Sequence, residues 1–146
     1  MRLTLHTDYA LRVMMQLAVE EDLVTIEAIA QAYDISRNHV MKVVQRLAAL
    51  GYVDSRRGRN GGLRLARVAR EINVGELVRK MEETGQVVEC FDSATSGCVV
   101  SPVCGLRHAL AGAVDQFLGH LDKFTLADLV HKPVAFRALL NEPVAA

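Results

Sequence analysis

The chain has 146 residues, of which 51% are hydrophobic, enough for one packed domain with a helical extension. No apolar run approaches the ~20 residues that span a bilayer, and the N-terminus lacks a signal-peptide pattern, so we expect a cytoplasmic protein without a membrane partner. The net charge of zero conceals an asymmetry, because nine basic residues and one acidic residue lie between Ser36 and Arg70. A local charge of +8 is typical of a surface that binds a polyanion.

The first half of the chain has the apolar spacing of three helices. The first is predicted over residues 3–19. Thr25 is the predicted N-cap of a second helix at 26–32, and Ser36 caps a third that runs to residue 50 and ends at Gly51. The third helix has an apolar stripe on one face, formed by Val40, Val43, Val44, Leu47 and Leu50.

A β-hairpin is predicted next, because strand-like runs at 52–56 and 63–66 flank a loop rich in glycine. A short helix at 74–81, capped by Asn73, precedes a loop. A long amphipathic helix at 106–122 and a short one at 125–130 follow, and no element is predicted after 133. The expected fold is mainly α with a small β-hairpin: a winged helix-turn-helix plus a long dimerisation helix. We divide it into a DNA-binding region (1–82), a cluster-binding loop (83–103), the dimerisation and short helices (104–132) and a tail (133–146).

The order helix, turn, helix, hairpin predicts a winged helix-turn-helix that binds double-stranded DNA. The first turns of the recognition helix meet base edges, where Arg reads guanine and Asn reads adenine, and helix N-caps favour phosphate. Arginines at the tip of the hairpin, the wing, suit the minor groove. A solvated basic face is the alternative for the charged block at 36–70, and a solvated surface residue is the alternative for His39. The predicted DNA-binding residues are Thr25, Ser36, Arg37, Asn38, His39, Lys42, Arg56, Arg57, Arg59 and Asn60.

The apolar face of the long helix needs a covering surface, and in a chain this small we expect the same helix of a second copy. A homodimer also suits a palindromic operator, whose two half-sites are read by two recognition helices. The alternative is packing against the first helix of the same chain.

Cys90, Cys98 and Cys104 form the pattern C-x7-C-x5-C. An odd number of cysteines within 15 residues is a poor disulfide framework and favours metal or redox chemistry. Thiolates are the usual ligands of iron–sulfur clusters, with a fourth position left for another residue. Zinc, a set of redox thiols and three unrelated cysteines are the alternatives. The candidate fourth ligands are His108, Asp92, Glu89 and, from the other subunit, Asp8.

The sequence resembles the Rrf2 family of bacterial iron–sulfur transcription regulators over nearly its whole length. Three segments carry the resemblance: the three loop cysteines, the wing at 57–63, and an opening in which Met1-Arg2-Leu3-Thr4 is followed by Thr7-Asp8-Tyr9-Ala10-Leu11-Arg12. Within the family, the start at Thr7-Asp8-Tyr9 and the stretch Cys104-Gly105-Leu106-Arg107 are most similar to the repressors that sense nitric oxide.

The resemblance implies a homodimeric repressor with a [4Fe-4S] cluster, or alternatively [2Fe-2S], on Cys90, Cys98 and Cys104. It implies Asp8 of the partner subunit as fourth ligand, with His108 as the alternative, and nitric oxide as the signal. A regulator of iron–sulfur supply or of redox state, or a thiol or iron–sulfur redox protein, are the other functions that we consider. We predict that the chain is not an enzyme, since it has no Cys-x-x-Cys pair, nucleotide-binding loop or catalytic triad.

Overall fold

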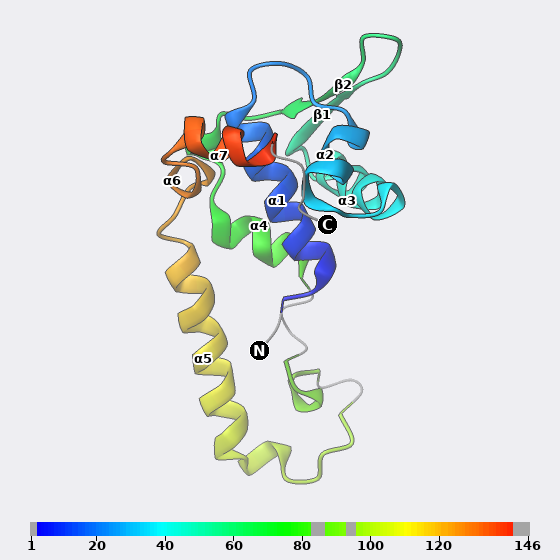
Figure 1. Cartoon of the computed structure of the whole chain (residues 1–146). Coiled ribbons are helices and arrows are strands. Elements are labelled where there is room, and N and C mark those ends of the chain that lie inside the picture. Colours follow the sequence, from blue (N-terminus) through cyan, green and yellow to red (C-terminus); the bar gives the residue numbers. More distant parts are fainter. Residues whose placement is uncertain (1–2, 83–86, 93–95, 142–146) are drawn as a thin grey trace.

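A computed structural model describes residues 3–82, 87–92 and 96–141 (Figure 1). The fold is mainly helical with one two-stranded antiparallel sheet, which confirms the predicted fold class. The helices and strands are α1 (Leu5–Val19), α2 (Ile26–Tyr33), α3 (Arg37–Ala49), β1 (Val53–Arg56), β2 (Gly62–Leu65), α4 (Val74–Met81), α5 (Gly105–Leu121), α6 (Leu126–Leu129) and α7 (Pro133–Leu140). Short 3-10 turns occupy Ala69–Glu71, Glu89–Phe91 and Ser101–Val103.

The predicted N-caps are confirmed. The side-chain oxygens of Thr25, Ser36 and Asn73 accept hydrogen bonds of 3.1, 3.3 and 2.9 Å from backbone N–H groups three residues on. Gly51 follows α3 with a φ of 74°, the left-handed conformation in which glycine often ends a helix. The first helix begins later than predicted, at Leu5, because Thr4 caps it by accepting from the backbone N–H of Thr7.

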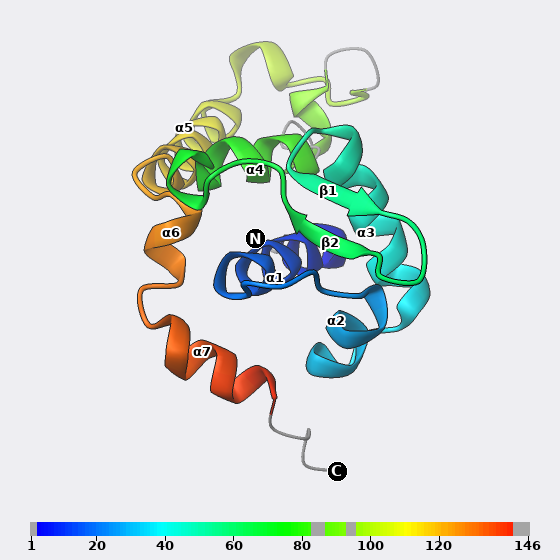
Figure 2. The ribbon, with the colours of Figure 1, turned by 90° about the horizontal axis from the view of Figure 1, so that it is seen from above.

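The core is built around α1, which runs through the centre of the molecule and contacts α3, β2, α4, α6 and α7 (Figure 2). Four of the five residues in the predicted stripe of α3 are buried, and Leu50 packs at the edge of the core. They meet fully buried side chains of α1, which are Ala10, Val13 and Met14. One face of α3 therefore fixes the helix, and its opposite face is left for solvent or a ligand.

The hairpin pairs Val53 with Leu65 and Arg56 with Gly62 at its two ends. An isolated bridge between Val24 and Leu63 ties β2 to the segment that leads into α2. A Cβ on Gly62 would lie 2.8 Å from the Leu23 Cβ, so this close approach requires glycine. The wing is thus anchored at its base on the helix-turn-helix.

Helix α5 extends away from the part of the molecule formed by α1, α2, α3 and the hairpin (Figure 1). Leu118 is its one buried residue, and it packs on Val74 and Val78 of α4 near the C-terminal end of α5. At the other end Leu106 is 66% exposed. Within residues 3–82, 87–92 and 96–141, no helix is both long and apolar enough to cross a membrane.

Helix α7 was not predicted, since no pattern after residue 133 indicated an element. It lies beside α1 (Figure 2), and the Arg137 guanidinium donates to the carbonyl oxygen of Val19, with Nε at 3.1 Å. Glu20 and Glu21 lie 3.8 and 3.6 Å from the same guanidinium. A tertiary contact at the C-terminal end of α1 therefore holds α7, which local periodicity does not reveal.

Candidate DNA-binding surface and cysteine segment

The predicted contact residues of the recognition helix all lie on its exposed face. Ser36, Arg37, Asn38, His39 and Lys42 are exposed, opposite the buried stripe of the same helix. The Arg37 guanidinium pairs with the Glu27 carboxylate of α2 at 3.3 Å, and both side chains are more than 60% exposed. Such a surface pair contributes about 0–1 kcal/mol, so DNA can compete for Arg37 at little cost.

The tip of the wing is narrow and positively charged. Its predicted contact residues, Arg56, Arg57, Arg59 and Asn60, are all exposed. Gly58 has a φ of 109°, which L side chains rarely adopt, and a Cβ on Gly61 would lie 2.3 Å from the Arg56 carbonyl oxygen. The two glycines therefore shape the tip.

Some basic residues of the +8 segment have structural partners instead of an open surface. Arg46 of α3 donates to the Lys80 carbonyl oxygen at 3.2 Å, and Arg64 pairs with Asp54 at 3.4 Å. Arg67 donates to the Gly51 carbonyl oxygen at 3.1 Å and lies over the Tyr52 ring. The other basic side chains of the segment form no ion pair or hydrogen bond within the part of the chain that the structure describes. They are Lys42, Arg56, Arg57, Arg59 and Arg70.

Helix α1 contacts both helices of the helix-turn-helix through aromatic side chains. The Tyr9 and His39 ring centroids are 6.1 Å apart, which joins α1 to the recognition helix. The Tyr33 hydroxyl, at the end of α2, donates to the Arg12 carbonyl oxygen at 3.2 Å. Burial raises the pKa of Tyr33 to about 12, so this hydroxyl keeps its proton at physiological pH.

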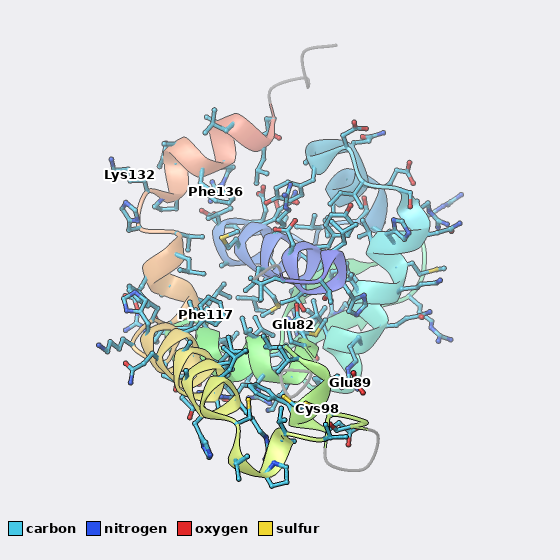
Figure 3. The ribbon with its side chains drawn as sticks, turned by 90° about the horizontal axis from the view of Figure 1, so that it is seen from below. Glu82, Glu89, Cys98, Phe117, Lys132 and Phe136 are labelled. Atoms are coloured by element: carbon cyan, nitrogen blue, oxygen red, sulfur yellow. The ribbon has the colours of Figure 1, made fainter. Side chains whose placement is uncertain are left out.

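The three cysteines are free thiols in the segment between α4 and α5. Cys90 and Cys104 are partly buried, and Cys98 is exposed; Figure 3 shows Cys98 near Glu89. The Glu89 carboxylate accepts from the Gly97 backbone N–H at 2.9 Å, which holds the two stretches of this segment together. Helix α5 begins immediately after Cys104.

In kind, the donor set fits an iron–sulfur cluster, because three accessible thiols without a disulfide can all bind as thiolates. The positions of these thiols in the described structure do not form a metal site within one chain. Among the described residues, no three His, Cys, Asp or Glu side chains come close enough to hold a metal ion. The three cysteines are therefore not brought together as a ligand group within the described part of one chain.

The two candidate fourth ligands have different surroundings. The Asp8 carboxylate forms an ion pair of 2.8 Å with Arg12 and is 40% exposed. His108 lies one turn into α5, beside a cavity of about 370 Å³ that Phe91, the neighbour of Cys90, also lines. His108 is thus within reach of the cysteine segment of its own chain, whereas Asp8 lies on a different element.

The helix-turn-helix, the anchored wing and the free cations on both define a winged-helix protein that binds DNA. The chain belongs to the Rrf2 family, whose model, described as an iron-dependent transcriptional regulator, matches residues 3–132. It is 53% identical over 143 residues to the HTH-type transcriptional regulator NsrR of Bacillus subtilis, covering 97% of this chain and 98% of the relative. It is 46% identical to NsrR of Bacillus licheniformis, covering 97% and 100%.

Solved structures agree on the fold. CymR, the global cysteine regulator of B. subtilis, superposes with a TM-score of 0.70 at 26% identity, covering 90% of this chain and 97% of CymR. IscR of T. potens superposes with a TM-score of 0.72 at 23% identity, covering 99% and 94%. The relatives are transcription regulators, which confirms that this DNA-binding chain is a regulator and not an enzyme.

Proposed function

We propose that the protein is a homodimeric repressor whose affinity for its operator is controlled by an iron–sulfur cluster that senses nitric oxide. Exposed side chains at the start of α3 would read the major groove, and Arg56, Arg57 and Arg59 of the wing would bind the backbone or the minor groove. The match to the iron-dependent family model and the 53% identity to NsrR support this function.

The exposed face of α5 supports the homodimer. Of the 17 residues of this helix only Leu118 is buried, and Val114, Phe117 and Leu121 beside it are partly buried against α4. Leu106, Val99 and Val103 at the far end are 66%, 92% and 85% exposed, next to the cysteine segment. Exposed apolar surface of this kind marks an interface, and pairing α5 with its copy would cover it.

Cys90, Cys98, Cys104 and Asp8 of the partner subunit would hold the cluster, as [4Fe-4S] or alternatively [2Fe-2S]. When bound, iron supplies the reactivity toward nitric oxide. The observation that carries the proposal is the link from Asp8 to the recognition helix. Tyr9, the next residue along α1, contacts the ring of His39 on α3. A change in the position of Asp8 would therefore move a residue of the predicted DNA surface.

The test is anaerobic purification followed by a visible absorption spectrum and operator binding, each measured before and after stoichiometric nitric oxide. We expect a coloured protein that loses absorbance and releases DNA together. A colourless protein that contains zinc and still binds DNA would refute the cluster. Colour with no response to nitric oxide would refute nitric oxide as the signal.

A second candidate is a regulator of iron–sulfur supply or redox state. The position of His108 beside the cavity lined by Phe91 favours it, because a ligand from the same chain makes Asp8 unnecessary. In that case operator binding would follow cluster occupancy or oxidation and not nitric oxide.

A further inference from the structure

The last turn of α4 is hydrogen-bonded to two helices of the DNA-binding region. Arg46 of α3 donates through Nη2 to the Lys80 carbonyl oxygen at 3.2 Å. The backbone N–H and hydroxyl of Thr4, the N-cap of α1, lie 2.6 and 3.0 Å from the Glu82 Oε1. These hydrogen bonds join the end of α4 to residues that lie 34 and 78 positions away from their partners in the sequence.

These contacts use groups that a helix end leaves free. Helix α4 ends at Met81, so the Lys80 carbonyl has no partner within the helix. A guanidinium at this position satisfies the carbonyl and lies at the negative end of the helix dipole. Hydrogen bonds that involve a charged group are stronger than neutral ones, so both contacts can hold these helices in register.

The Lys80 side chain adds a contact with the wing. Its ammonium pairs with Glu76 at 2.5 Å and lies 5.3 Å from the centre of the Tyr52 ring. Tyr52 is fully buried and directly precedes β1, the first strand of the hairpin. One residue of α4 therefore contacts the recognition helix through its backbone and the base of the wing through its side chain.

The same helix end is near one part of the proposed ligand set in sequence and is hydrogen-bonded to the start of the helix that carries the other part. Cys90 lies only eight residues after Glu82 in the chain, and Figure 3 shows Glu82 on the side of the molecule where Cys98 lies. Thr4, held by Glu82, caps α1 one turn before Asp8. The end of α4 is therefore hydrogen-bonded to α3 and to the N-cap of α1, and it is the helix that precedes the cysteine segment in the chain.

We propose that residues 80–82 are the coupling element of the regulator. Displacement of the cysteine segment, or of the start of α1, would shift the end of α4 and, through Arg46, the recognition helix. Arg46 is then a positioning residue and not a phosphate contact, although it belongs to the +8 segment. The inference rests on the proposed function, since it needs a state with cluster and a state without it. Coupling is a ratio of affinities, so it is measurable separately from affinity itself.

The experiment compares operator dissociation constants with and without cluster for Arg46→Ala and Glu82→Ala. Arg70→Ala and Glu71→Ala are matched controls, because they remove the same charges from exposed side chains that form no ion pair in the described part of the chain. We expect the ratio between the two states to fall at least about fivefold in both variants. The visible absorption should stay that of the wild type, and both controls should keep the wild-type ratio.

An unchanged ratio in Arg46→Ala and Glu82→Ala would overturn the inference. So would a loss of affinity that is equal in both states, since Arg46 would then be a phosphate contact. If either variant fails to fold, Arg46→Lys keeps the charge and loses the guanidinium geometry, and the same reduced ratio is expected. A wild-type protein whose two states bind the operator equally would instead refute the proposed function.

Discussion

Asp8 and Arg12 lie one turn apart on α1 and form an ion pair of 2.8 Å, and Arg12 in turn lies 5.8 Å from the centre of the Tyr33 ring. Both charged side chains are about 40% exposed, so the pair stabilises the fold by at most about 1 kcal/mol. Asp8 can therefore leave Arg12 for a metal at small cost. Its departure would free a guanidinium beside the end of α2, the first helix of the helix-turn-helix.

Replacing Asp8 by Ala should weaken the response to nitric oxide or make the cluster less stable, because a ligand is lost while the thiols remain. The measurement is operator binding and visible absorption of the anaerobic protein before and after nitric oxide. Asp22→Ala, which removes an exposed acidic residue just after α1, is the control and should behave as the wild type. An Asp8→Ala variant with unchanged operator binding, spectrum and response would contradict the role of Asp8.

The alternative ligand is tested by His108→Ala. If Asp8 is the fourth ligand, this variant should keep the cluster spectrum and the response, because His108 then only borders the cavity near Phe91. His131→Ala, an exposed histidine after α6, is the matched control. Loss of absorption in His108→Ala with full absorption in Asp8→Ala would assign the ligand to His108 and favour the second candidate function.

Arginines of the wing should contribute to DNA binding through phosphates. For Arg57→Ala or Arg59→Ala we expect weaker operator binding, with the slope of log K against log salt reduced by about 1 for each lost phosphate contact. Arg64→Ala is the control in the same hairpin, because Arg64 already pairs with Asp54 and should change the slope less. Titrations at several salt concentrations measure this. A slope equal to that of the wild type in Arg57→Ala and Arg59→Ala would mean that the tip does not touch phosphate.

Much of the fold was predictable because its signals are local. The caps Thr25, Ser36 and Asn73 act within three residues, and the stripe of α3 repeats with the period of a helix. Helix α7 depends on Arg137 reaching the end of α1, 118 residues away in sequence, and no local pattern encodes that contact.

The candidate site was predictable by residue type and not by partner. The basic residues at 36–70 form one block in the sequence, whereas in the structure Arg46 and Arg67 bind backbone carbonyls. Such contacts depend on tertiary geometry, and so does the hydrogen bond from Thr4 to Glu82. The cysteines were found by their clustering in sequence, but that clustering does not decide whether the thiols meet in space, and in the described part of the chain they do not form a ligand group.

The junction of α4 and α5 gives a prediction on stability and pH. Arg79 donates two hydrogen bonds of 2.5 and 2.7 Å to Asp122, and Asn73 donates to the Asp122 carbonyl oxygen at 2.7 Å. The hydrogen bond from Arg79 holds the pKa of Asp122 below its ordinary value of 3.8. A carboxyl whose pKa is lowered by folding stabilises the fold at pH values above its ordinary pKa. This contribution is lost as the pH falls through the lowered pKa.

Asp122→Asn should therefore lower the melting temperature at pH 7, where the wild-type carboxylate is ionised and paired with Arg79. The difference from the wild type should shrink as the pH falls below 3.8, because the wild-type carboxyl then becomes neutral as well. Thermal unfolding followed by circular dichroism at both pH values measures this, with Asp22→Asn as a control that should show no such trend. A difference that stays constant with pH would mean that Asp122 acts through its shape at the junction and not through its charge.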